Sequence, residues 1–384
     1  MAVSFPSALI RYKRLERNWS QEGLCDGICA VSYLSKIEQG KAEPNPEMLQ
    51  ALMERLDIVW YDKAAPEAKA LVEELWEAIA ALDVEEENCL REQLADDREQ
   101  YLNGPYMLDV LLLERLHWHM VTPQDVQMLS AFEECFDNRQ RTWYLMLQGR
   151  FEEALRLTPT AFVYLSCGSQ AYNSGNYTLA VERLLQSCTL AAEEGCARVM
   201  LLARTLLGNC YSDQGDYDAM LRHYRTAERL ARDLREEETL AGIYYNIAAT
   251  DLQLGRYEKA HAYFASLEDP YAMALHKLAV CQEKLGQREA ALETLKRVDY
   301  TLRDHAGSGD CPDREWIERM CMLVRKRLEN PNYLHDPAYG EMLLNAYADM
   351  QKELPNGFVL FHRPWVEEWY VANRQYKQAY EVKR

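Results

Sequence analysis

The chain has 384 residues, of which 48% are hydrophobic and 27% charged, and its formal net charge is −18 at pH 7. This length is too great for one compact core, so we expect two domains or an extended array, and the hydrophobic content excludes a disordered chain. We find no apolar run that could span a bilayer and no signal-peptide pattern, so we expect a cytoplasmic protein without membrane contact.

The 11 cysteines are not arranged as zinc sites, because no C-x-x-C pair and no Cys/His set at zinc spacing occurs. We expect them to be small buried apolar residues in a reducing compartment. Phosphate-binding, dinucleotide-binding, zinc-protease and nucleophile-elbow sequences are also absent. The sequence therefore predicts no metal site, no cofactor and no enzymatic activity.

Residues 6–60 predict a small N-terminal domain of five short helices. The first covers Ser7–Arg17, and Ser20 caps a second that begins at Gln21. After a tight turn a third helix runs from about residue 30 to 39 and ends at Gly40, a fourth covers Met48–Leu56, and Ile58 to Tyr61 closes the domain. Two short helices across a turn indicate a helix-turn-helix, in which the later helix enters the major groove of DNA.

The charge of this head differs in sign from that of the whole chain. Residues 1–41 contain six lysines and arginines against four acidic residues, so the acidity belongs to the remainder. A locally basic head on an acidic body is compatible with a docked duplex.

From Pro66 onward the sequence predicts helix after helix. Degenerate helical pairs are expected over 71–82, 86–101, 106–120 and 122–136. A phrase then recurs, a glycine with an aromatic residue two positions on and an alanine five positions on, complete or nearly so at Gly149, Gly175, Gly215, Gly255 and Gly286. Such repetition predicts a solenoid of stacked helix pairs with a long concave surface suited to binding another chain.

Around Gly215 the repeat follows the tetratricopeptide pattern, with Gly208 as the small residue between two helices and Tyr217 and Tyr224 as the rings that fill the gap. The predicted fold class is all-α, with a helix-turn-helix domain followed by a right-handed tetratricopeptide solenoid. The predicted domains are residues 1–62 and 66–384, the latter made of degenerate repeats (66–140), clear repeats (141–300) and capping helices (301–384).

The first helix of each repeat lines the concave surface, and several of its polar residues are candidates for holding a peptide. An asparagine side chain donates and accepts together, so it can clamp a peptide backbone. Asn209 and Asn246 occupy the two consensus asparagine positions, and the other candidates are Tyr245, Tyr172, Asn173, Ser169 and Thr205. The alternative is that the asparagines bond the backbone of a neighbouring repeat.

The stretch Ile28-Cys29-x-x-Ser32-x-x-Ser35-x-Ile37-Glu38-x-Gly40, followed by these repeats, resembles the peptide-responsive regulators of the RRNPP family, whose heads are repressor-type helix-turn-helix domains of the XRE class. The resemblance implies a quorum-sensing transcription regulator that binds a short linear signalling peptide in its concave groove. It also implies a homodimer on a near-palindromic double-stranded DNA operator, with two recognition helices one DNA turn apart.

Carried over by position, the resemblance assigns DNA-contacting roles in the head. Gln21 would bond a phosphate, and Arg14 in the basic first helix would add non-specific affinity. The positions that would face the major groove are Ala30, Val31, Ser32, Tyr33 and Lys36, whereas Leu34 and Ile37 point inward and Glu38 makes an internal contact.

Three other interpretations stay open. The head could be degenerate and mediate only protein contacts. The repeats could sequester a protein partner such as a response regulator. The chain could also be a phage-encoded receptor for a communication peptide.

Overall fold

The computed structural model describes residues 4–61, 66–118, 123–304, 314–354 and 356–383. Within these ranges every regular element is a helix, so the predicted all-α class is confirmed. In this part of the chain no helix has both the length and the apolar character needed to cross a bilayer.

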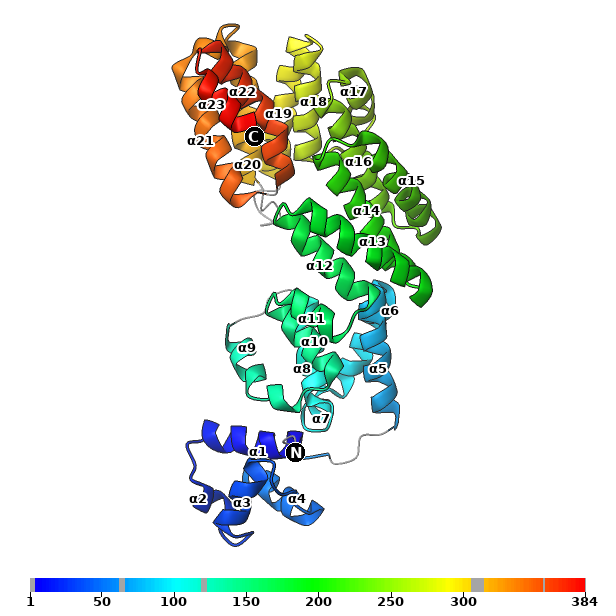
Figure 1. The fold of residues 1–384 in the computed structure, drawn as a ribbon, viewed down its shortest axis with the longest axis vertical. Coiled ribbons are helices and arrows are strands. Elements are labelled where there is room, and N and C mark those ends of the chain that lie inside the picture. The colour runs from blue at the N-terminus through cyan, green and yellow to red at the C-terminus, as the bar shows by residue number, and fades with distance from the viewer. Residues whose placement is uncertain (1–3, 62–65, 119–122, 305–313, 355, 384) are drawn as a thin grey trace. The chain divides into compact units, whose positions relative to one another are not determined.

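The helices of the first part of the chain are short and follow one another closely (Figure 1). The head contains α1 (Phe5–Glu16), α2 (Gln21–Cys25), α3 (Val31–Glu38) and α4 (Pro46–Arg55). After it come α5 (Pro66–Ala81), α6 (Val84–Asp96), α7 (Arg98–Leu102), α8 (Met107–Trp118), α9 (Pro123–Ser130), the short 3₁₀ helix η1 (Glu133–Cys135), α10 (Asn138–Leu147) and α11 (Phe151–Leu157).

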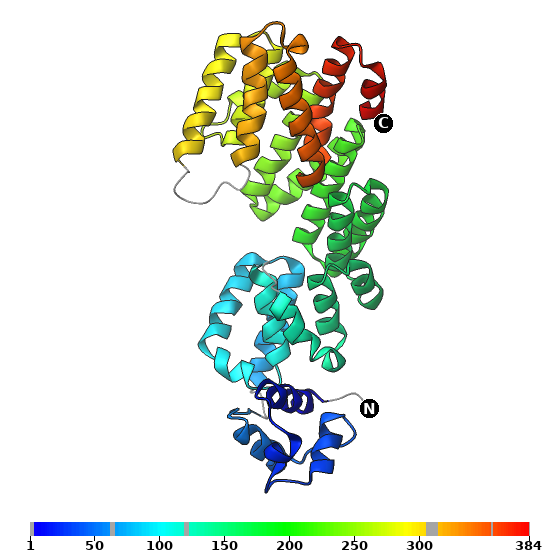
Figure 2. The same ribbon diagram turned by 90° about the vertical axis from the view of Figure 1, so that its left-hand side faces the viewer.

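Longer helices follow, and between residues 217 and 304 each helix packs against the next (Figures 1 and 2). They are α12 (Ala161–Asn173), α13 (Tyr177–Glu194), α14 (Ala197–Asp213), α15 (Tyr217–Leu234), α16 (Glu237–Gln253), α17 (Tyr257–Ala265), α18 (Ala272–Lys284) and α19 (Arg288–Asp304). The last are α20 (Arg314–Glu329), the 3₁₀ helix η3 (Tyr333–His335), α21 (Pro337–Glu353), α22 (Asn356–Ala372) and α23 (Tyr376–Lys383).

By their internal contacts the residues form two compact units. The first holds Met1–Cys167 and Leu185–Met200, and the second holds Gly168–Leu184 and Leu201–Arg384. The division passes through α12, α13 and α14 and not through a linker. It does not coincide with the domain boundary predicted near residue 64, which stays a prediction.

The recurring glycines have one backbone conformation in common. Gly149, Gly175, Gly215, Gly255 and Gly286 all have positive φ, between 73° and 76°. In each case the next N–H bonds to the carbonyl five residues before it, at 2.8–2.9 Å, which is the Schellman ending of a helix. Glycine adopts this left-handed conformation without a Cβ penalty, and the phrase therefore marks the turn inside each helix pair.

A second glycine position sets how closely two helices approach. A Cβ at Gly208 in α14 would collide with the ring of Tyr224 in α15, which is 1% exposed. Gly168 packs in the same way against Leu184, because a Cβ added to Gly168 would lie 2.6 Å from the Cγ atom of Leu184. The predicted role of Gly208 as the small residue of a helix pair is confirmed.

Four apolar side chains of the head are fully buried, namely those of Leu24, Leu34, Ile37 and Leu52. The predicted cap is present, because the Ser20 hydroxyl accepts a hydrogen bond from Gly23 N at 3.0 Å. Within the first unit, α1 also packs on the body, since the Phe132 ring lies 5.6 Å from that of Phe5 and 5.2 Å from that of Tyr12. The head therefore shares a core with the helices that follow it.

Residues 4–61 form four helices, so the prediction of a fifth over residues 58–61 is wrong. Asp57 adopts a left-handed conformation (φ 51°) directly after α4, and Ile58 N bonds back to Met53 O at 2.9 Å. The chain then leaves as an extended segment whose Tyr61 N–H donates to Asn103 O at 2.9 Å.

An ion pair buried inside the head joins α1 to α3. Arg14 donates from Nε and Nη2 to the two carboxylate oxygens of Glu38 at 2.6 and 2.8 Å, and from Nη1 to Trp19 O at 2.7 Å. Arg14 is 8% and Glu38 3% exposed. The prediction that Arg14 lies on a DNA-facing surface is therefore wrong, because a buried carboxylate needs this partner.

We predict that Gly208→Ala lowers the stability of the second unit by about 1–3 kcal/mol, because the added methyl group displaces the buried Tyr224 ring. Gly242→Ala is the matched control, since a Cβ there meets nothing within 4 Å. The control should be neutral or stabilising by about 0.5–1 kcal/mol. Urea unfolding of both variants measures the difference, and equal stabilities would contradict the packing.

We predict that Arg14→Met destabilises the head by about 3–5 kcal/mol, because Glu38 would stay buried without its partner. Lys13→Met, which breaks the ion pair to Glu16 and a contact with the Tyr12 ring at the helix surface, should cost less than about 1 kcal/mol. Hydrogen exchange of the α2 and α3 amides measures this locally, and unchanged protection in Arg14→Met would contradict it.

Candidate functional site

The exposed face of α3 is the first candidate site. Ala30, the N-cap residue, and Val31, Ser32 and Lys36 are exposed, whereas Tyr33 is half-buried and its hydroxyl donates to Glu43 O at 3.0 Å. The opposite face buries Leu34 and Ile37 completely, as their spacing predicts. The five candidates for contact with the major groove therefore lie together. Ala30 is at the N-terminal end of α3, and Val31, Ser32, Tyr33 and Lys36 are on the helix itself.

Gln21 stands at the first position of α2 and is half-buried. Its Nε2 donates to Oε2 of Glu38 at 2.7 Å, so the carboxylate that holds Arg14 also orients this amide. An amide nitrogen has two N–H groups, and one remains for a second acceptor.

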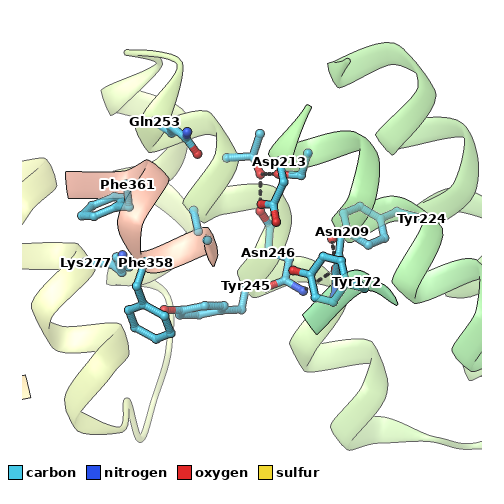
Figure 3. Close-up of a pocket in the computed structure, with 14 residues that line it drawn as sticks. Tyr172, Asn209, Asp213, Tyr224, Tyr245, Asn246, Gln253, Lys277, Phe358 and Phe361 are labelled. Carbon is cyan, nitrogen blue, oxygen red and sulfur yellow. Dashed lines mark hydrogen bonds between the residues drawn. The ribbon is translucent and has the colours of Figure 1, made fainter. Parts of the chain in front are cut away.

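The second candidate site is a cavity of about 190 Å³ in the second unit (Figure 3). Three helices that start repeats, α14, α16 and α18, supply most of its wall, together with α12, α15 and the beginning of α22. The lining residues are Tyr172, Asn209, Ser212, Asp213, Tyr224, Tyr245, Asn246, Ala249, Thr250, Gln253, Lys277, Gly357, Phe358 and Phe361.

Two asparagines form the polar centre of this cavity. Asn209 Oδ1 accepts from the Tyr224 hydroxyl at 2.5 Å and from Asn246 Nδ2 at 3.2 Å. The oxygen of Asn209 is thus saturated, and its Nδ2 has no protein acceptor among the described residues. An amide held in this way presents a fixed N–H donor to a ligand.

Beside the asparagines, a hydroxyl chain ties α14 to α16. Thr250 Oγ1 donates to Asn246 O at 2.8 Å, so the 2.7 Å contact with Ser212 is a hydrogen bond donated by Ser212. These bonds position the polar wall before any ligand arrives.

An acidic group and a basic group lie in the same cavity. The Asp213 carboxylate accepts from the Tyr177 hydroxyl at 3.0 Å, and burial raises the pKa of Asp213. Lys277, in α18, is 5% exposed, and burial lowers its pKa to about 7. Figure 3 shows Lys277 with Phe358 and Phe361 at one end of the cavity and Tyr172 with Asn209 at the other.

Helix α22, the one before the last, closes part of the groove. Asn356 Nδ2 donates to the Tyr177 hydroxyl at 2.6 Å, a contact between residues 179 positions apart. Phe358 and Phe361, two and five residues further along the same helix, form part of the cavity wall. The groove is therefore a pocket with a wall from outside the repeats.

Four of the seven predicted peptide-contacting residues line this pocket, namely Tyr172, Asn209, Tyr245 and Asn246. The other three lie outside its wall. Asn173 is exposed at the end of α12, Ser169 is half-buried, and the Thr205 hydroxyl donates to Leu201 O at 2.9 Å. Whether any of the seven contacts a ligand stays a prediction.

Sequence reasoning missed Lys277, Phe358 and Phe361 as pocket residues, and treated Tyr224 only as a core residue. The repeat pattern around Gly208 predicted that the Tyr224 ring packs between two helices. The direction of the Tyr224 hydroxyl depends on the neighbouring helix and could not be predicted in this way. Lys277 and the two phenylalanines carry no repeat signature that would have found them.

The described part of the chain holds no cluster of three histidine, cysteine or acidic residues that could bind a metal ion, and its cysteines are all free.

Comparison with known proteins agrees with this arrangement. A helix-turn-helix family matches residues 10–59, and a tetratricopeptide-repeat family matches residues 199–269. Over 294 residues the chain is 23% identical to the transcriptional activator NprA of Geobacillus stearothermophilus, an alignment that covers 64% of this chain and 67% of the relative.

Solved structures share the fold at low identity. A Rap protein complexed with Competence and Sporulation Factor superposes with a TM-score of 0.65 and 15% identity, over 83% of this chain and 96% of that one. NprR in complex with its cognate peptide NprX has a TM-score of 0.57 and 16% identity, over 83% of this chain and 100% of that one. The apo form of the quorum sensor NprR from B. thuringiensis has the same TM-score.

A helix-turn-helix domain precedes tetratricopeptide repeats in this chain, and a transcriptional activator is similar to it over most of its length. The chain therefore combines a helix-turn-helix segment with tetratricopeptide repeats, and it is similar to a transcriptional activator that the comparison aligns with 64% of its residues.

Proposed function

We propose that this chain is a cytosolic transcription regulator that binds double-stranded DNA through α3 and a short linear signalling peptide in the pocket of its second unit. The observation that carries the proposal is the pocket itself, in which amide, hydroxyl and aromatic groups converge on helices of a tetratricopeptide array. Such an array presents paired donors and acceptors to an extended backbone.

On the DNA side, support comes from the exposed face of α3. Ser32 and Lys36 offer polar groups that can reach base edges, and Val31, which is 43% exposed, offers a methyl surface for thymine. The free N–H of Gln21 would meet a phosphate, and this contact positions the helix without reading sequence.

For the peptide, one end of the pocket offers amide groups and the other offers aromatic rings (Figure 3). Asn209 and Asn246 would hold the peptide backbone, and Tyr245, Phe358 and Phe361 would receive its apolar side chains. Because α22 supplies part of the wall, a bound peptide would contact both the repeats and α22.

A homodimer would place two copies of α3 about one DNA turn apart on a near-palindromic operator. A peptide alters DNA binding only if it has different affinities for two conformations of the protein. We infer that α22 is part of the element that differs between them, since it is held to the groove by the bond between Asn356 and Tyr177.

We predict that selection from a random DNA duplex library at low salt enriches a near-palindromic site. Lys36→Met should lose about 1–3 kcal/mol of discrimination between this site and a scrambled duplex, because a base-edge contact is removed. Lys41 is an exposed lysine outside α3, and Lys41→Met should weaken the binding of both duplexes equally. If no sequence is enriched and no duplex is shifted, the head does not bind DNA.

We predict that Ala249→Phe abolishes binding of pooled random heptapeptides, because the added ring fills the pocket and removes no hydrogen bond. Ala241→Phe lies two turns earlier on α16 at an exposed position and should leave binding unchanged. Fluorescence anisotropy with labelled pools measures both. If Ala249→Phe binds the peptides as well as the unmodified chain, they bind elsewhere.

A further inference from the structure

Lys277 is a buried cation whose side chain ends in the pocket. It lies in the middle of α18, is 5% exposed, and contributes to the pocket wall. Its Nζ lies 3.2 Å from the centre of the Phe361 ring, and Figure 3 shows it beside Phe358 and Phe361. A cation over an aromatic face is stabilised, but by less than burial costs a full charge.

No anion accompanies this ammonium group. Across the described residues Lys277 forms neither an ion pair nor a hydrogen bond. Arg327, the other cation buried in this region, has an anionic partner, because it holds Glu283 through two bonds of 2.6 and 2.5 Å and stacks on Trp365. The carboxylate of Glu283 is thus already paired with Arg327.

The neighbouring titratable groups do not supply a negative charge either. His276 and His362 are fully buried, and burial lowers the pKa of His362 to about 3 and that of His276 well below its usual range, so both are neutral. Cys281, one turn further along α18, stays a thiol because burial raises its pKa to about 12. Asp213 lines the same pocket but forms no ion pair with Lys277.

A buried cation without an anionic partner lowers the stability of the fold. Its presence in the wall of a pocket therefore points to a role in binding. The cost shows in the pKa of Lys277, which burial lowers to about 7. An incoming carboxylate would supply the missing charge beside a side chain that is only 5% exposed, so the attraction would be stronger than between two surface groups.

We propose that Lys277 receives a carboxylate of the bound ligand and so selects peptides that bring an acidic group to this end of the pocket. The inference rests on the proposed peptide-binding function and extends it to the class of peptide. The carboxylate can be the C-terminal group or an aspartate or glutamate side chain, with the backbone running toward Asn246 and Asn209.

Three heptapeptide pools test the proposal on the full chain. The first has a free C-terminus and no Asp or Glu, the second is amidated and contains Asp and Glu, and the third is amidated without Asp or Glu. We expect the first or the second pool to bind at least tenfold more tightly than the third, and the pool that binds identifies the source of the carboxylate.

The variant Lys277→Met should remove this preference. It should bind all three pools with the weak affinity of the third, and its melting temperature should rise because an unpaired buried charge is gone. Lys284→Met, at the exposed end of the same helix, is the control and should change neither quantity. A residue with only a packing role would not combine weaker binding with higher stability.

Proton uptake gives a readout that a packing role would not produce. The carboxylate would raise the pKa of Lys277, so binding takes up a proton above pH 7 and affinity should fall by up to tenfold per pH unit. The other titratable groups near Lys277 or in the pocket wall are His276, Cys281, Arg327, His362, Tyr245, Tyr224 and Asp213. Subtracting the pH profile of Lys277→Met removes their contributions.

The outcomes separate the two proposals. Equal binding of all pools, unchanged in Lys277→Met, would overturn the role of Lys277 and leave the peptide-binding function standing. Binding of no pool, under conditions in which the head binds DNA, would overturn the peptide-binding function and this inference with it.

Discussion

The contact between Gly208 and Tyr224 is the constraint on which the second unit depends. The glycine leaves room for the ring, and the ring sets the spacing of α14 and α15. The hydroxyl of the same ring donates to Asn209, which in turn accepts from Asn246 in the next repeat. One side chain therefore determines both how two helices pack and how the polar wall of the pocket is oriented.

Buried charges that join helices have partners, whereas the buried charge in the pocket wall has none. Arg14 with Glu38 joins two helices of the head, and Arg327 with Glu283 joins two helices of the second unit. Each pair is bidentate, so the desolvation cost is offset by charge-assisted bonds. Lys277 lacks such a partner and stands in a pocket wall, where a charge without a partner is available for recognition.

The need of a buried charge for a partner also explains why the prediction that Arg14 lies on a DNA-facing surface is wrong. In the sequence it is one of several cations in an amphipathic helix, and a cation there normally lies on the surface. Its burial follows from Glu38, which is 24 residues away on a face shared with Leu34 and Ile37. A pairing of this length has no local signature. Its effect on Gln21, whose amide the same carboxylate orients, could also not be predicted from the spacing of residues.

The sequence by itself determined the helical class, the order of head and repeats, and the turn inside each helix pair. These depend on local features, namely periodic apolar positions, a cap at Ser20, and glycines such as Gly215 that alone adopt the left-handed conformation without strain. Four pocket residues followed as well, because the repeat places them on its inner helices. Only the tertiary structure decided that α22 returns to the groove and that Lys277 ends there without a partner. Contacts over such separations, 179 residues between Tyr177 and Asn356, depend on how whole helices pack and not on the residues beside them in the chain.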